Sequence, residues 1–268
     1  MNCKTEKKEI LSFDLDMTLV DDKDNKIPRS AIDAINQVRN DYYIVIATGR
    51  NLELAANQYV LEELKPDAWV HNNGAQVHIE GKQVYYHEFN KDLLKRLLDF
   101  SISRRLCVCA MLNNVEYCTI PQDLKAIQYI LSGDARPEYD DVMKLLELPV
   151  QTLGFVGTDE KAQILRDAFP ELKIPSVIPN IWCDIMEKNI SKVVGMEKVL
   201  SHYQLTMKDV IAFGDSMNDY EILKAAGYAV AMGNAADGLK EIADYITDDV
   251  DKDGSANALR MLCRKSNL

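Results

Sequence analysis

Two aspartates, Asp14 and Asp16, directly follow the apolar segment 9–13 and are the clearest candidates for chemistry in this chain. The segment has the character of a buried β-strand, and a side-chain period of two places both carboxylates on the same side. Neighbouring carboxylates are unfavourable at neutral pH unless a cation or a shared proton compensates their charge. The pair therefore indicates chemistry, although a surface acidic turn also arises readily in a chain with 42 Asp and Glu residues.

Two more polar clusters also follow strand-like segments. Thr48-Gly49-Arg50 comes after the β-branched and aromatic run 42–47, and the cluster 214–219 comes after the apolar run 209–213. Ligands of an open parallel sheet bind beyond the carboxyl ends of its strands, so the three clusters are expected to meet at one edge. Each cluster alone has a simpler explanation, such as a loop turn or a helix N-cap. Their common position after strands favours a shared site.

Predicted strands and helices alternate along the chain around these clusters. Apolar positions predict an amphipathic helix over 30–38 and a helix over 52–64, and short strands are expected at 68–70 and 228–231. The β-α-β-α-β order implies a parallel sheet with helices on its faces.

A different pattern begins near Gly81. Hairpin-like and mixed segments replace the regular alternation, which resumes near Ile190, and strands are expected over 107–112, 115–120 and 150–156. We therefore predict an α/β core domain formed by residues 1–80 and 182–268, with an inserted domain over 81–181. An insertion of about 100 residues is in the usual size range of a small domain.

Composition narrows the class of protein. The net charge of −11 argues against a nucleic-acid binder, and anionic substrates would need a cation or a local Lys and Arg cluster. We expect no membrane span, because the chain has no long uncharged apolar run, and no secretory signal, because residues 1–8 are too polar. The six cysteines form no CxxC pair, so we expect cytosolic thiols and a cytoplasmic protein. Cys107 and Cys109 lie in an apolar run and are predicted to be core residues.

The three clusters, together with Ser191-Lys192, resemble the four motifs of the haloacid dehalogenase (HAD) superfamily of phosphatases, and more narrowly its Cof-like branch with an inserted α/β cap. The first motif corresponds to Asp14-x-Asp16-x-Thr18, the second to 48–50, the third to Ser191-Lys192 and the fourth to 214–219. Residues 73–74, 232–235 and 253–254 extend the resemblance over most of the core. Two positions depart from the pattern, since Met17 and Val193 stand where glycine is common. The resemblance implies a Rossmann-like parallel-sheet core with an inserted α+β cap.

The resemblance also implies roles for individual residues. Asp14 would be the nucleophile and form an aspartyl-phosphate, and Asp16 would be the general acid and base. Mg²⁺ would be held by the Asp14 carboxylate, the Asp16 backbone carbonyl and Asp215, with Asp219 in a second tier near metal-bound water. Lys192 would neutralise phosphate charge. The residues expected to bind the phosphate or substrate are Thr48, Gly49, Asn73 and Asn218.

The expected function is hydrolysis of a small phosphorylated metabolite, with sugar phosphates as the commonest substrate class of the family. One alternative is a phosphomannomutase-like phosphotransferase, which returns the phosphoryl group to a sugar. Another is a catalytically silent sensor of phosphorylated metabolites, although the complete set of Asp14, Asp16, Lys192 and Asp215 counts against it. The sequence does not indicate the physiological substrate, the cap contacts or the oligomeric state.

Overall fold

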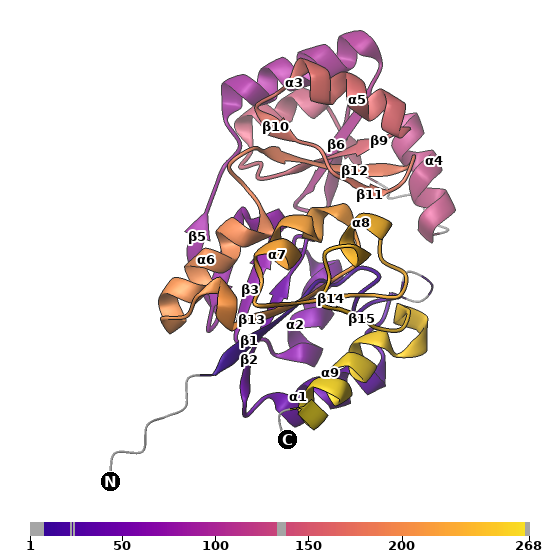
Figure 1. Ribbon diagram of the computed structural model, residues 1–268. Helices are drawn as coiled ribbons and strands as arrows, with labels where there is room; N and C mark the ends of the chain where they lie inside the picture. The colour runs from indigo at the N-terminus through magenta and orange to yellow at the C-terminus, as the bar shows by residue number, and fades with distance from the viewer. Residues whose placement is uncertain (1–7, 22, 24, 133–137, 266–268) are drawn as a thin grey trace. The chain divides into compact units, whose positions relative to one another are not determined.

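The computed structural model describes residues 8–21, 23, 25–132 and 138–265. The chain divides into two compact units, each with its own β-sheet (Figure 1). The first unit comprises residues 1–52, 56–85 and 192–268, and the second comprises residues 53–55 and 86–191.

The sheet of the first unit is parallel over six strands, in the order β15-β14-β13-β1-β2-β3. β4 then pairs antiparallel with β3, and β5 completes the edge. Because helices cover both faces, the central strands are buried on both sides, and their sequences are continuous apolar runs. The strands are β1 (Glu9–Phe13), β2 (Tyr42–Ala47), β3 (Ala68–His71), β4 (Gln76–Ile79), β5 (Lys82–Tyr86), β13 (Val210–Gly214), β14 (Tyr228–Ala231) and β15 (Tyr245–Ile246).

The helices of the first unit form two groups. One apolar cluster contains residues of α6 (Lys192–Tyr203), α7 (Tyr220–Ala225) and α8 (Asp237–Lys240). A second cluster contains residues of α1 (Arg29–Val38), α2 (Gln58–Leu64) and α9 (Gly254–Lys265), and α1 and α9 lie side by side (Figure 1). Short 3₁₀ turns are η1 (Ala55–Asn57), η2 (Asn72–Gly74), η4 (Met207–Asp209), η5 (Met217–Asp219) and η6 (Val250–Lys252). No helix in the described part of the chain is long and apolar enough to cross a bilayer.

The second unit has a mostly antiparallel sheet in the order β10-β12-β9-β6-β7-β8, with β11 also paired to β12. Leucines of α3 (Lys91–Arg104) and α5 (Asp159–Ala168) pack with the strands in one apolar cluster, and Leu124 of α4 (Pro121–Ser132) belongs to another. The remaining elements are β6 (Cys107–Leu112), β7 (Val115–Cys118), β8 (Tyr139–Asp140), η3 (Val142–Glu147), β9 (Leu153–Val156), β10 (Leu172–Lys173), β11 (Ser176–Ile178) and β12 (Trp182–Glu187).

The α/β class and the parallel core are confirmed, whereas several boundaries differ from those predicted. The predicted helix over 52–64 is α-helical only at 58–64 and begins with turns. Residues 82–85, which were predicted to lie in the inserted domain, belong to the first unit as part of β5. Residues 182–191, predicted to be core, belong to the second unit, because β12 pairs with β9 and β10.

The packing of α6 predicts a steric effect at Gly195. A Cβ atom there would lie 2.3 Å from Val70 Cγ1 and 3.0 Å from Gly74 Cα. Gly195→Ala is expected to lower the free energy of unfolding by about 1–3 kcal/mol, although alanine is the better helix former. Urea denaturation measures the change. Gly238→Ala is the matched control, because its Cβ meets only ordinary contacts from 3.6 Å outward. Equal stability of the two variants would contradict the packing described.

Candidate active site

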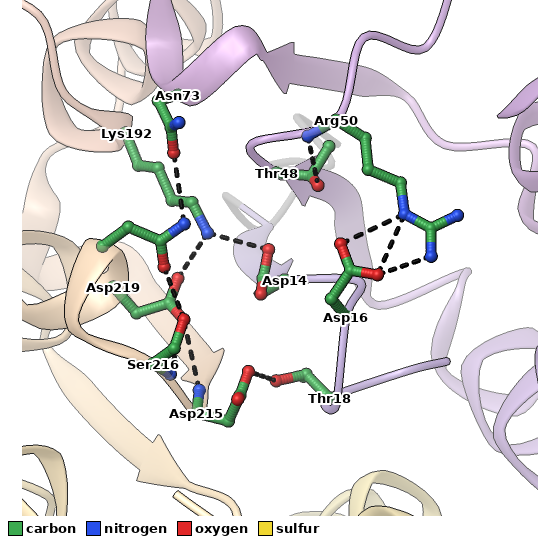
Figure 2. Close-up of polar contacts among 11 residues, drawn as sticks. Asp14, Asp16, Thr18, Thr48, Arg50, Asn73, Lys192, Asp215, Ser216 and Asp219 are labelled. Atoms are coloured by element: carbon green, nitrogen blue, oxygen red, sulfur yellow. Dashed lines mark hydrogen bonds and ion pairs between the residues drawn. The ribbon is translucent and has the colours of Figure 1, made fainter. Parts of the chain in front are cut away.

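Residues from five separate segments of the chain meet at the carboxyl edge of the first unit's sheet (Figure 2). Asp14 follows β1, Thr48 follows β2, and Asn73 lies in η2 directly after β3. Asp215 follows β13, and Lys192 is the first residue of α6. The structure therefore brings together side chains that the sequence places up to about two hundred residues apart.

The centre of the site is a buried lysine between two carboxylates. Lys192 Nζ donates a hydrogen bond to Asp14 Oδ1 at 2.8 Å and another to Asp219 Oδ1 at 2.6 Å. The exposed side-chain fractions are 1% for Lys192, 5% for Asp14 and 1% for Asp219. A charged lysine is stable at such a position only when it is paired and hydrogen-bonded, and both conditions are met here.

Asp219 serves to hold this lysine and the loop after β13. Its Oδ2 accepts hydrogen bonds from the backbone N–H groups of Asp215, at 3.2 Å, and Ser216, at 3.3 Å. The carboxylate reaches these groups by passing close to Gly214, where a Cβ atom would lie only 2.6 Å from Asp219 Cγ. Gly214 is therefore required sterically, and Asp219 orients the residues around it.

The electrostatics of the site show an excess of negative charge. Burial and the charge of Asp219 raise the pKa of Asp14 to about 8, although Lys192 opposes the shift. Burial and the charge of Asp14 raise the pKa of Asp215 as well. Burial disfavours the Lys192 ammonium, but Asp14 and Asp219 outweigh this effect and raise its pKa. One ammonium thus does not balance the surrounding carboxylates.

The donor set fits a hard divalent cation. Asp14, Asp215 and Asp219 each place a carboxylate oxygen within 4.8 Å of the others. Thr18 Oγ1 donates to Asp215 Oδ1 at 3.1 Å and so fixes that carboxylate. An all-oxygen set with surplus negative charge suits Mg²⁺-like ions. Since Asp219 already binds Lys192 and two backbone groups, Asp14 and Asp215 are the better placed direct ligands.

Asp16 lies apart from this carboxylate cluster and is bound by Arg50. Arg50 Nε donates to both carboxylate oxygens of Asp16, at 3.0 and 3.1 Å. The guanidinium also donates to Asn25, Asn57 and Tyr59. Figure 2 shows Asp14 between this pair and Lys192. Arg50 had no individual role in the sequence prediction, although it is the third residue of Thr48-Gly49-Arg50.

The predicted phosphate-binding residues form two groups, one at Thr48 and Gly49 and the other at Asn73 and Asn218. Thr48 is fully buried, its Oγ1 accepts from the backbone N–H of Arg50, and Gly49 lies between these residues. Asn218 Nδ2 donates to Asn73 Oδ1 at 3.2 Å, and the backbone N–H of Asn73 donates to Thr48 O. Asn73 has a positive φ of 52°, a conformation that asparagine tolerates better than most residues.

Met17 also has a positive φ, of 55°. Its backbone N–H donates to Val20 O, and its carbonyl accepts from Asn234 Nδ2, which fixes the turn that follows the two aspartates. A methionine in this conformation is strained relative to glycine. The left-handed turn explains physically why glycine is common at this position in the superfamily that the sequence resembles.

Comparison with known proteins agrees with this geometry. The haloacid dehalogenase-like hydrolase family matches residues 11–259. A Bacillus subtilis (strain 168) protein named "Putative phosphatase YkrA" is 31% identical over 257 residues, which cover 95% of this chain and 97% of the relative. The 5-amino-6-(5-phospho-D-ribitylamino)uracil phosphatase YitU of the same organism is 27% identical, with 94% and 96% covered.

A solved structure is similar over nearly the same length. BT1666, a HAD-superfamily phosphatase from Bacteroides thetaiotaomicron, has a TM-score of 0.86 and 25% identity, with 97% of each chain covered. The family match spans all four motif regions, from the strand before Asp14 to the C-terminal helix. The chain therefore belongs to the haloacid dehalogenase-like hydrolase family and is a phosphatase.

Proposed function

We propose that this chain is a Mg²⁺-dependent phosphomonoester hydrolase that acts on a small phosphorylated metabolite, most specifically a sugar phosphate, through an aspartyl-phosphate intermediate. The observation that carries the proposal is the Asp14 carboxylate, which is buried beside both Lys192 and the carboxylate of Asp215. This arrangement places a nucleophile, the ammonium group of Lys192 and a further carboxylate for a metal ion at the same point.

The first half of the reaction would transfer the phosphoryl group to the protein. Asp14 attacks the phosphorus, the bond from phosphorus to the ester oxygen breaks, and Asp16 gives the departing alkoxide a proton. In the second half, Asp16 takes a proton from water, which attacks the same phosphorus and releases inorganic phosphate and free Asp14. Each cycle therefore returns both aspartates to their starting states.

Other residues would hold the phosphate while charge develops on it. Lys192 Nζ, already beside Asp14, would neutralise one equatorial oxygen. Thr48, the backbone N–H of Gly49, Asn73 and Asn218 would donate to the others. Asp219 would keep the Lys192 ammonium in place, because its Oδ1 accepts a hydrogen bond from that ammonium.

Asp14, Asp215 and the backbone carbonyl of Asp16 would hold the metal, with Asp219 in the second tier. When bound, Mg²⁺ supplies charge that lets an anionic carboxylate approach a phosphate dianion. The raised pKa values of Asp14 and Asp215 support a cation at this position, since without it the positive charge near the two carboxylates is too small to balance them.

The substrate class is inferred from the relatives and from the insertion. YitU is named for a substrate with a phosphorylated ribityl chain, which is a sugar-like phosphomonoester. We propose that the second unit, residues 53–55 and 86–191, acts as the cap that contacts the leaving group. Phosphate release from a panel of phosphomonoesters, without added sugar bisphosphate, tests the proposal. Turnover that requires a bisphosphate and releases little phosphate would instead indicate a mutase.

Removal of the metal should abolish activity. Dialysis against EDTA is expected to stop phosphate release, and Mg²⁺ should restore it, because the surplus negative charge at Asp14 otherwise repels the phosphate. Ca²⁺ should restore less activity, since its larger and looser coordination shell misplaces the reacting groups. Steady-state phosphate release measures the effect. Full turnover by a preparation shown to be metal-free would refute the metal dependence.

Replacement of the two aspartates should have different effects. Asp14→Asn should abolish the phosphoenzyme, because the amide is not a nucleophile. Asp16→Asn should slow phosphoenzyme formation by about 10²–10⁴-fold with a sugar phosphate and much less with p-nitrophenyl phosphate, whose leaving group needs little protonation. Hydrolysis of the phosphoenzyme should slow with both substrates, because Asp16 also activates the water. Rapid quench and peptide mapping locate the phosphoryl group. A phosphoryl group found on Asp16 would show that the two roles are misassigned.

A further inference from the structure

A cluster of three thiols lies in the second unit and has no part in the chemistry described above. Cys107 and Cys109 are on β6, and Cys118 is at the end of the neighbouring strand β7. Their exposed fractions are 2%, 2% and 5%. The three thiols share an apolar cluster with Leu124 and Val156, so the prediction that Cys107 and Cys109 are core residues is confirmed. Their mutual arrangement could not be read from the sequence.

Cys118 lies next to both cysteines of β6, Cys107 and Cys109. The Sγ atoms of Cys107 and Cys118 are 3.5 Å apart. Cys109 is the direct cross-strand partner of Cys118 in the antiparallel ladder. The flanking backbone bond runs from Thr119 N to Val108 O, so this pair occupies a non-hydrogen-bonded position. Cα atoms of such pairs are about 4.5 Å apart, a separation that a disulfide can span.

Cys118 is at the centre of the local sulfur contacts. The backbone N–H of Ile120 donates to its Sγ at 3.4 Å. Hydrogen bonding with the Cys107 and Cys109 thiols lowers the pKa of Cys118, whereas the pKa values of Cys107 and Cys109 are raised. Cys118 is thus the thiol that contacts Cys107, lies opposite Cys109 and accepts from a backbone N–H group, so either neighbouring thiol can reach its sulfur.

We propose that Cys107, Cys109 and Cys118 form a redox site, in which a peroxide oxidises Cys118 and one neighbouring thiol converts the product to a disulfide. The Cys118 thiolate attacks one peroxide oxygen, the O–O bond breaks, and hydroxide leaves, which gives a sulfenic acid. The Cys107 or Cys109 thiol then attacks the Cys118 sulfur. An S–S bond forms, the S–O bond breaks, and the thiol proton leaves with the hydroxyl group as water.

The test uses the reduced full-length chain and hydrogen peroxide under native conditions. After remaining thiols are alkylated, trypsin releases residues 106–125, which contain all three cysteines, and a Glu-specific protease cuts this peptide after Glu116. A disulfide holds the two pieces together until reduction, so mass spectrometry distinguishes it from a free thiol. We expect the linked pieces, with the loss of two hydrogens, and full reversal by dithiothreitol.

Matched variants test the assignment within the cluster. Cys118→Ser should abolish the linked product, and Cys107→Ser/Cys109→Ser should leave Cys118 as a sulfenic acid that dimedone captures. Cys183→Ser is the control, because this buried cysteine on β12 contacts Arg166 and Asp159 and belongs to another apolar cluster. The control should form the disulfide as the parent does.

Two results would overturn the proposal. One is that peroxide leaves all three thiols of the folded parent chain open to alkylation after denaturation. The other is that Cys183 is oxidised at least as fast as Cys118. Both measurements are made on the parent chain, so they do not depend on the folding of any variant, and neither depends on phosphatase activity.

Discussion

The buried ammonium of Lys192 is the constraint on which the rest of the site depends. It joins Asp14, 178 positions away in the chain, and Asp219, 27 positions away. Loss of one partner of a buried pair typically lowers the free energy of unfolding by about 3–5 kcal/mol, because the other charge remains unpaired in the protein interior, which solvates it poorly. The same contacts place a cation beside the proposed nucleophile. Both the stability of the fold and the proposed reaction therefore require Lys192 to be charged and held at this position.

Two glycines allow the pair to form. Gly195 lets α6 approach β3 closely enough to bring Lys192 to the edge of the sheet, and Gly214 leaves room for the Asp219 carboxylate. On the other side of Asp14, the turn at Met17 carries the chain from Asp16 to Thr18, whose hydroxyl orients Asp215. Close packing and backbone conformation thus position each charged group before any ligand binds.

Sequence reasoning predicted the buried strands well, because helices on both faces of a parallel sheet force continuous apolar runs such as 42–47. It placed the motif residues at the correct edge for the same reason, since parallel strands end together. It did not find the Arg50–Asp16 pair or the thiol cluster, because cross-strand and loop-to-loop contacts depend on side-chain geometry. It also missed that 182–191 belong to the second unit, since strand pairing and not composition decides that boundary.

A double-mutant cycle between Lys192 and Asp219 tests most directly whether one buried pair supports the site. Urea unfolding would be compared for the parent chain, Lys192→Met, Asp219→Asn and the double variant, without metal. Each single change is expected to lower the free energy of unfolding by about 3–5 kcal/mol. The double variant should lose at least about 1 kcal/mol less than the sum, because each single change removes the same hydrogen-bonded ion pair, which the double variant loses only once. Additive effects, or single changes that leave stability unaltered, would contradict the account.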